Sequence, residues 1–305
     1  MTGKTVVVVV LLLGQVVFAA QIQTYSERIG PCWVVQVHDG DSISVRLPTG
    51  KVASIRYLGI DAPDQGELAQ LAKERNRELV EEKALELAVL MVEGEYVTDR
   101  NGRWLACVLI ADAPTMPVQA ILLREGLARL EVQGADDEFS LCWESEFFQA
   151  QLEAVRNKAG LWGFHEFCAD QDFLIAAIRF WGETEEVYLV NRGETAIELA
   201  GDWVLLDESA REPWMRGEEP RNMIRFSEAF NPSCTLPPGG TLLVRTGPGV
   251  LPSQRKAAPQ GCGTTHVVLN WFGNRMWNND RDVAYLYTSA GSLVCSYRYP
   301  WQQAP

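Results

Sequence analysis

The residue types that carry chemistry in this chain are concentrated between positions 39 and 64. This stretch holds Asp39, Asp41, Asp61 and Asp64, together with Arg56. Carboxylate oxygens favour calcium or magnesium over zinc, and a guanidinium group can bind two phosphate oxygens at once. If the fold gathers these side chains, they predict a divalent cation beside an anionic substrate. The alternative is a solvated hairpin whose aspartates only mark turns, because Asp and Gly are the usual turn residues.

A hairpin is the element that would gather these side chains. Ile43, Val45 and Leu47 alternate with polar residues, which is typical of a half-buried strand. Residues 48–50 predict a turn, and residues 52–60 form a second strand-like run. The acidic start of the first strand and the acidic end of the second would then lie close together, with Arg56 beside them.

The chain after the hairpin mixes helical and strand-like patterns. The elements expected from them are a long helix at Gly66–Met91 with a charged outer face, a strand at Trp104–Ile110, a short helix between Pro117 and Gly126, and a helix within residues 138–160. The dipeptide Asn101-Gly102 predicts a tight turn before the strand. Arg103 follows this turn directly, from where it can reach the acidic cluster.

Several segments resemble the staphylococcal nuclease (thermonuclease) family in the same order and at plausible spacing. These segments are DGDS at 39–42, RYLGIDAPD at 56–64, TDRNGR at 98–103, VQAILLREGLA at 118–128 and KAGLW at 158–162. The resemblance implies a thermonuclease-like domain over residues 31–165, with an OB-like five-stranded β-barrel and helices. It also implies that phosphodiester bonds are hydrolysed with the help of calcium.

The resemblance assigns the metal ligands residue by residue. The two calcium-binding aspartates of the family fall on Asp41 and Asp61. The next ligand is a backbone carbonyl, which falls on Ala62 where the family has threonine. A backbone carbonyl is retained under this change of side chain, so the implied cofactor is Ca²⁺.

The resemblance also assigns the catalytic and substrate-binding groups. The two catalytic arginines fall on Arg56 and Arg103, and the catalytic carboxylate falls on Asp64, where the family has glutamate. Arg100 stands at the position of a phosphate-binding lysine. On the alternative interpretation, Arg56 is only a cross-strand ion-pair partner and Arg103 a surface charge beside a turn.

Two departures from the family pattern concern catalysis and substrate binding. The side chain of Asp64 is one methylene shorter than glutamate, so its carboxylate would lie farther from an attacking water. Base-stacking tyrosines of the family are replaced by Asn101, Val132 and Gly134. Since stacking contributes roughly 1–3 kcal/mol per base, their loss should weaken substrate binding without removing the catalytic centre.

After Trp162 the pattern changes to short strands separated by turns rich in Gly, Pro, Asn and Asp. The predicted strands are Glu186–Val190, Trp203–Leu206, Met223–Phe226, Thr241–Arg245, Val267–Trp271, Val283–Tyr287 and Leu293–Tyr299. The segments VYLVNRG at 187–193, LAGDWVLLD at 199–207, LPPGGTLLV at 236–244 and WNNDRDVAYLY at 277–287 resemble the lamin-tail domain. This resemblance implies an Ig-like β-sandwich over residues 172–300.

The first 20 residues have the pattern of a secretory signal peptide. Lys4 precedes an apolar run that ends in small residues, and Val17 and Ala19 suit a cleavage site. The run is short and interrupted for a membrane span. We therefore expect a cleavable signal peptide at 1–20, a secreted or periplasmic protein, and no stable membrane span after cleavage. An uncleaved anchor is the alternative.

Charge and cysteine content limit the partners further. The net charge is −13 and the pI is near 4.8, whereas proteins that coat nucleic acid are usually basic. Phosphate recognition must therefore be local, through a few arginines and a metal ion. An oxidising compartment permits disulfides, and the odd number of 7 cysteines leaves at least one thiol without an internal partner. Cys107 lies in an apolar pattern typical of a buried free thiol.

Together these observations predict a mainly β fold with helices, in which an OB-like barrel precedes an Ig-like β-sandwich. The implied protein is an exported calcium-dependent endonuclease, a hydrolase that acts on DNA and, by resemblance, on RNA. One alternative is a catalytically weak or inactive nuclease-like protein that serves as a binding or scaffold module for nucleic acid or envelope partners. Another is that the sandwich is the main functional part and binds an envelope component.

Overall fold

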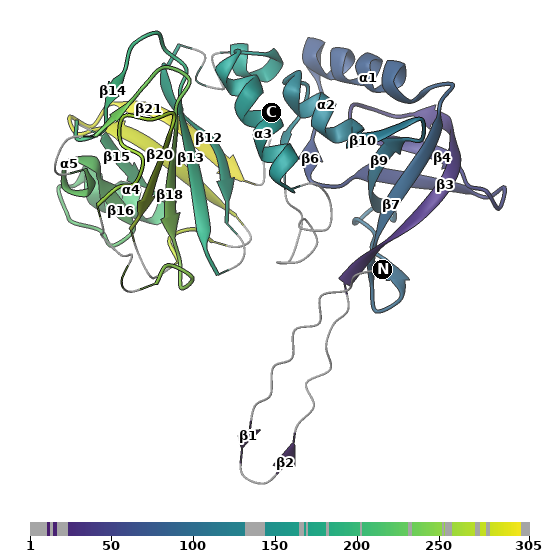
Figure 1. Cartoon of the computed structure of the whole chain (residues 1–305), viewed down its shortest axis with the longest axis horizontal. Coiled ribbons are helices and arrows are strands. Elements are labelled where there is room, and N and C mark those ends of the chain that lie inside the picture. Colours follow the sequence, from purple (N-terminus) through teal and green to yellow (C-terminus); the bar gives the residue numbers. More distant parts are fainter. Residues whose placement is uncertain are drawn as a thin grey trace.

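The computed structural model describes residues 11–12, 15–16, 24–131, 144–164, 168, 170–180, 183–201, 203–230, 234–251, 253, 258–271, 275–278 and 281–299. Within these residues the fold is mainly β with five α-helices, as expected (Figure 1). The predicted signal peptide at 1–20 lies outside them, apart from two short paired strands, β1 (Leu11–Leu12) and β2 (Gln15–Val16).

A closed five-stranded barrel, OB-like, forms the first half of the fold. Its strands are β3 (Thr24–Val37), β4 (Ser42–Arg46), β5 (Val52–Tyr57), β7 (Ala84–Val92) and β9 (Trp104–Ile110). Strands β7, β3, β4 and β5 are antiparallel neighbours, β5 pairs with β9 in parallel, and β9 closes the ring on β7. The predicted hairpin is therefore confirmed as β4 and β5.

Short strands extend this barrel at two places. Strands β8 (Glu95–Tyr96) and β10 (Ala113–Pro117) lengthen the sheet, and β6 (Ile60–Asp61) pairs with β11 (Arg129–Leu130). The second pairing matters for function, because β6 ends in one of the candidate metal ligands.

The predicted helix over Gly66–Met91 is wrong in its second part. Helix α1 runs over Gly66–Val80, and the chain then turns and continues as β7. Glu82 in this turn has a φ of 58°, which interrupts a right-handed helix. Leu85, Leu87 and Val89 fit a period of two as well as part of a helical stripe, and all three are buried in the barrel core. Tertiary packing thus decides between two local patterns.

The other helices of the first half agree with the sequence pattern. They are α2 (Val118–Arg124), α3 (Glu144–Arg156) and the short 3₁₀ helix η2 (Gly160–Gly163). Phe147, Leu152 and Val155 of α3 are buried, so the apolar stripe is core as expected. No helix in the described part of the chain is long and apolar enough to cross a membrane.

Two four-stranded sheets make up the second half. One contains β12 (Phe173–Arg179), β13 (Glu185–Asn191), β18 (Thr241–Thr246) and β19 (His266–Asn270), and the other β16 (Met223–Arg225), β15 (Trp203–Leu206), β20 (Asp282–Thr288) and β21 (Leu293–Tyr299). A separate pair is β14 (Ile197–Glu198) with β17 (Thr235–Leu236). All seven predicted strands are present with shifts of at most one residue at either end.

Besides the short paired strands β14 and β17, three elements of the second half were not predicted. Strand β12 is a nearly continuous buried run and shows no alternation. Helix α4 (Glu208–Met215) contains Pro213 and is capped by Asp207, whose side chain accepts a hydrogen bond from the Ala210 N–H. The third is the short helix α5 (Phe226–Ala229). A proline within a short polar segment conceals the helical pattern of α4.

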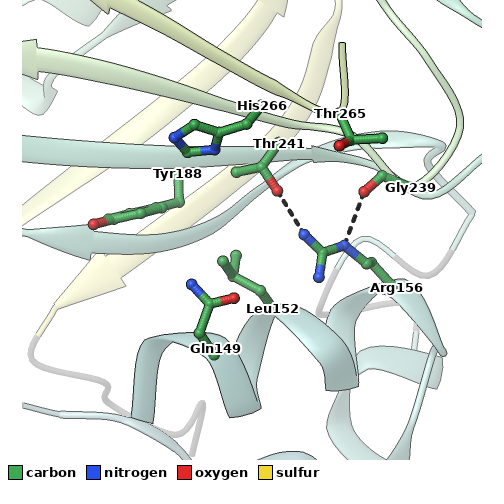
Figure 2. A pocket seen from close by; sticks show the side chains of 8 residues that line it. All are labelled: Gln149, Leu152, Arg156, Tyr188, Gly239, Thr241, Thr265 and His266. Carbon is green, nitrogen blue, oxygen red and sulfur yellow. Dashed lines mark hydrogen bonds between the residues drawn. The ribbon is translucent and has the colours of Figure 1, made fainter. Parts of the chain in front are cut away.

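Helix α3 joins the two halves and lies between the barrel and the second set of sheets (Figure 1). Its Arg156 donates from Nε to the Gly239 carbonyl at 2.9 Å and from Nη2 to Thr241 Oγ1 at 2.7 Å (Figure 2). Residues of both halves form one continuous hydrophobic core. The division into 31–165 and 172–300 stays a prediction, and β3 begins earlier than that division, at Thr24.

The cysteines agree with the expected disulfides and the expected unpaired thiol, but not with the expected state of Cys107. Disulfides join Cys168 to Cys295 and Cys234 to Cys262, and Cys107 is also disulfide-bonded. The interpretation of Cys107 as a buried free thiol is therefore wrong, because an apolar strand pattern does not distinguish a thiol from a half-cystine. Cys32 is a free, buried cysteine, which agrees with the odd count.

Candidate active site

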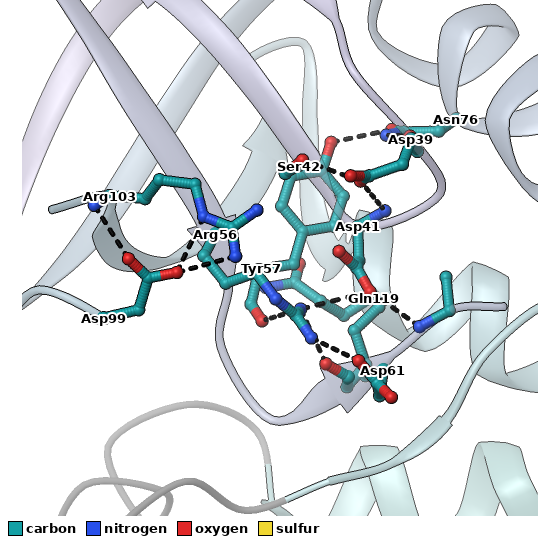
Figure 3. A network of polar contacts seen from close by, with 12 residues as sticks. Asp39, Asp41, Ser42, Arg56, Tyr57, Asp61, Asn76, Asp99, Arg103 and Gln119 are labelled. Atoms are coloured by element: carbon teal, nitrogen blue, oxygen red, sulfur yellow. Dashed lines mark hydrogen bonds and ion pairs between the residues drawn. The ribbon is translucent and has the colours of Figure 1, made fainter. Parts of the chain in front are cut away.

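The hairpin places the candidate arginine between two acids (Figure 3). Ser42 on β4 is the cross-strand partner of Arg56 on β5, so Asp41, the residue before Ser42, lies close to the guanidinium. Arg56 Nη1 lies 3.2 Å from Asp41 Oδ2, and Nη2 lies 2.6 Å from Asp61 Oδ1. The chain thus brings Asp41, Arg56 and Asp61 together, although they come from three separate strand ends.

Arg56 is held rigidly by acceptors on several sides. Besides the two carboxylates, Nη1 donates to the Tyr57 carbonyl at 3.1 Å and to the Ile60 carbonyl at 2.8 Å. The residue is only 4% exposed. A guanidinium fixed in this way is preorganised, because its orientation does not depend on the substrate.

The carboxylates outnumber the cations at this place. Burial raises the pKa of Asp41 to about 8, against the attraction of Arg56, and Asp39 and Asp61 raise it further. Burial also raises the pKa of Asp61, where Arg56 and Arg129 oppose the shift and Asp64 adds to it. A divalent cation would relieve this excess of negative charge. Because the donors are hard oxygens, the residues present fit a hard divalent cation such as calcium or magnesium.

The backbone around the acids is packed closely. The Ala62 N–H donates to Asp41 Oδ2 at 2.6 Å, which ties the end of β6 to the start of β4. A Cβ atom at Gly40 would lie 2.6 Å from the Ala62 Cβ and 2.7 Å from the Ala72 Cβ. Only glycine therefore fits between these two alanines, so Gly40 has a packing role in addition to its role in the turn.

A second layer of polar residues holds the turn that carries Asp41, and the sequence pattern did not reveal it. Asp39 accepts from the Asp41 N–H at 3.0 Å and from the Ser42 hydroxyl at 2.7 Å. Asn76, on the buried face of α1, donates to the Asp39 carbonyl at 2.9 Å and accepts from the Tyr57 hydroxyl at 2.7 Å. The available signal was an asparagine among the apolar positions of an amphipathic helix.

Arg103 lies beside this centre, but its charge is paired with another acid. Strands β5 and β9 are parallel, with Leu105 opposite Arg56. Arg103 therefore lies just before the part of β9 that pairs with Arg56. Its Nη2 lies 2.6 Å from Asp99 Oδ2. Burial opposes ionisation of Asp99, but hydrogen bonds from Arg103 and Asn101 outweigh it and hold the Asp99 pKa below its ordinary value.

The remaining predicted residues lie at the surface. Asp64 is exposed in the loop before α1, and it is close enough to Asp61 to raise the pKa of that residue. Arg100 and Asn101 are exposed in the turn before β9. The predicted replacements of stacking tyrosines at Val132 and Gly134 lie outside the described residues.

The described residues contain no separate metal-binding cluster that competes with this centre. Among the described residues, no group of three or more His, Cys, Asp or Glu side chains could hold a metal ion. The metal site predicted here has two carboxylates and one backbone carbonyl, which is fewer than three such side chains. The pocket in Figure 2 lies between α3 and the sheet of β13 and β18, and none of its lining residues belongs to the acid–arginine centre.

Fold and site together define an OB-like barrel with a buried guanidinium between two carboxylates, and the barrel is of the kind found in staphylococcal nuclease. Residues 54–163 match the family model described as staphylococcal nuclease homologue. The match includes Arg56, Asp61, Asp64 and Arg103, whereas Asp41 precedes it. The comparison with curated proteins found no match. The chain thus contains a domain over residues 54–163 that is similar to staphylococcal nuclease.

Proposed function

We propose that this protein is a calcium-dependent nuclease that hydrolyses phosphodiester bonds of DNA, and of RNA as well. The observation that carries the proposal is the buried Arg56 guanidinium, bonded to both Asp41 and Asp61 within a domain that matches a nuclease family. If Arg56 served only as a cross-strand ion-pair partner, one acid would be sufficient. Two acids on one buried arginine are an arrangement suited to a cation and a phosphate.

The chain's own residues divide the work of hydrolysis. Asp41, Asp61 and the Ala62 carbonyl would hold the calcium ion, which when bound neutralises a phosphate oxygen as a Lewis acid. Arg56 and Arg103 would donate to phosphate oxygens whose negative charge grows in the transition state. For Arg103 this requires that the substrate phosphate replaces Asp99 as its partner. Asp64 would orient the attacking water or accept its proton, and Arg100 would bind a neighbouring phosphate.

Two further proposals concern the rest of the chain. The signal-like residues 1–20 support export to the periplasm or the medium, and disulfides such as Cys168–Cys295 suit an oxidising compartment. The short strands of the second half and their sequence segments support a lamin-tail-like domain. No partner is proposed for this domain, since a fold by itself does not determine a ligand.

The proposed activity is tested with purified protein and labelled single-stranded DNA, with calcium or with a chelator. We expect shortened products only when calcium is present. A parallel reaction with single-stranded RNA tests the second substrate. Binding of DNA without cleavage under either condition would favour the inactive, binding-module alternative over the enzyme.

Asp64 provides a prediction about the catalytic carboxylate. Because its side chain is shorter than the glutamate of the family, Asp64→Glu is expected to increase turnover, since an ångström-scale misplacement can cost ~10²-fold. Asp64→Asn is expected to lower turnover strongly, because an amide cannot accept the proton. Turnover of the three proteins is compared at saturating calcium.

Glu67, exposed in the first turn of α1, is the matched control for Asp64. Glu67→Gln should leave turnover unchanged. If aspartate, glutamate and asparagine at position 64 all give the same rate, Asp64 is not the catalytic carboxylate, and a lower rate in Glu67→Gln would transfer that role to Glu67.

A further inference from the structure

The strand that carries Asp61 is supported by the second half of the chain. Strand β6 has one neighbour, β11, whose Arg129 is the cross-strand partner of Asp61 and whose Leu130 is the partner of Ile60. The Glu131 N–H also donates to the Gly59 carbonyl at 3.1 Å. The position of Asp61 therefore depends on β11 as well as on Arg56 and on the hydrogen bond from the Ala62 N–H to Asp41.

Strand β11 is in turn held by α3. The Leu130 N–H, which β6 does not use, donates to Gln151 Oε1 at 2.6 Å. Gln151 is completely buried, and its Nε2 donates to the Ala176 carbonyl at 2.7 Å and lies 3.3 Å from the Tyr297 hydroxyl. One buried amide thus connects β11 of the barrel to β12 and β21 of the second half.

Tyr297 makes a second contact with β11. The Arg129 guanidinium carbon lies 4.2 Å from the centre of the Tyr297 ring, and Arg129 Nη2 donates to the Arg298 carbonyl. A cation over an aromatic face is favourable, and more so when the pair is desolvated. Here both partners are at most 5% exposed. The disulfide between Cys295 and Cys168 fixes β21 to the segment that follows η2.

We propose that Tyr297 and Gln151 are positioning residues for the candidate metal site, through which the second half of the chain holds β11 and hence Asp61 in place. On this view the C-terminal sheets complete the active centre of the barrel and are not an independent appendage. Outer partners that orient metal ligands typically change metal affinity by 10–100-fold when removed. The effect on metal affinity rests on the proposed function, whereas the mechanical coupling of Tyr297 to β6 does not.

The test compares two tyrosines of the second half in the full-length protein. Tyr297→Leu removes the ring beneath Arg129, and Tyr297→Phe removes only the hydroxyl and should retain most of the effect of the ring. Tyr285→Leu is the matched control, because Tyr285 is 6% exposed on β20 and belongs to a separate hydrophobic cluster with Tyr287. If Tyr297→Leu does not fold, Tyr297→Met fills similar volume without a ring.

Two measurements are made on each variant. Amide hydrogen exchange reports local opening, and we expect it to become at least tenfold faster in residues 58–62 and 129–131 of Tyr297→Leu but not of Tyr285→Leu. The calcium affinity from titration calorimetry should fall about tenfold or more in the same variant only. Equal exchange of β6 and β11 in both leucine variants would overturn the proposal. If the exchange differs as expected but the wild-type protein binds no calcium, the coupling stands and the proposed function fails.

Discussion

Replacing Arg56 by alanine is expected to lower turnover by a hundredfold or more and to destabilise the folded protein as well. The loss of turnover follows from the loss of a donor to the developing negative charge. The loss of stability follows from burial, because Arg56→Ala leaves the buried carboxylate of Asp41 without its cation and removes the ion pair of Asp61. Breaking a buried pair in this way typically costs about 3–5 kcal/mol. Turnover is measured at a temperature where the variant is folded, and stability by urea unfolding.

A lysine at the same position separates the two effects. Arg56→Lys keeps a positive charge but cannot bridge both acids and the Ile60 carbonyl with one planar group. We expect it to recover part of the stability and little of the turnover. An alanine variant that is as active and as stable as the wild type would show that Arg56 is neither catalytic nor structurally important.

Arg103→Ala is expected to lower turnover by roughly 10²–10³-fold, like the removal of other transition-state donors, with little loss of stability. The side chain of Arg103 is 26% exposed, and its ion pair with Asp99 lies within one turn. The Asp99 side chain is only 6% exposed, but it keeps the hydrogen bonds from the Asn101 and Arg103 N–H groups when the guanidinium is removed. Turnover and urea unfolding are measured side by side, and full activity of Arg103→Ala would restrict this residue to the role of a surface charge.

Asp99→Asn is the control for the role of the ion pair. It weakens the hold on Arg103 without removing the guanidinium. If Arg103 must leave Asp99 to bind the substrate, this variant should keep its turnover or exceed that of the wild type. If the pair is needed to aim Arg103 at the substrate, the variant should be as slow as Arg103→Ala.

Local pattern was sufficient for the part of the site that lies on neighbouring strands. The alternation of Ile43, Val45 and Leu47 and the turn that follows define a hairpin, and its register places Asp41 beside Arg56. Seven strands of the second half were predictable for the same reason, because they are bounded by strong turn residues, whereas the buried run of β12 was not. Resemblance to a known family supplied the roles, which residue types alone did not assign.

Local pattern failed where tertiary contacts decide the outcome. Residues 84–91 fit a helix and a strand almost equally well. They form β7 because they pair with β3 on one side and with β9 on the other, which closes the barrel. The sequence pattern did not single out Asn76, since its partners Tyr57 and Asp39 are distant in sequence. Gln151 is a similar case: its partners lie on β11, β12 and β21, and sequence spacing contains no information about them.

We expect the acids beside Arg56 to hold a calcium ion that the hydrolysis of DNA requires. The most direct measurement is the rate of single-stranded DNA cleavage as calcium is titrated, for the wild-type protein and for Asp41→Asn and Asp61→Asn. We expect a rate that rises to saturation with calcium in the wild type and disappears with chelator. Either variant should need at least tenfold more calcium for the same rate. Cleavage that persists in chelator, or the same calcium dependence in all three proteins, would contradict it.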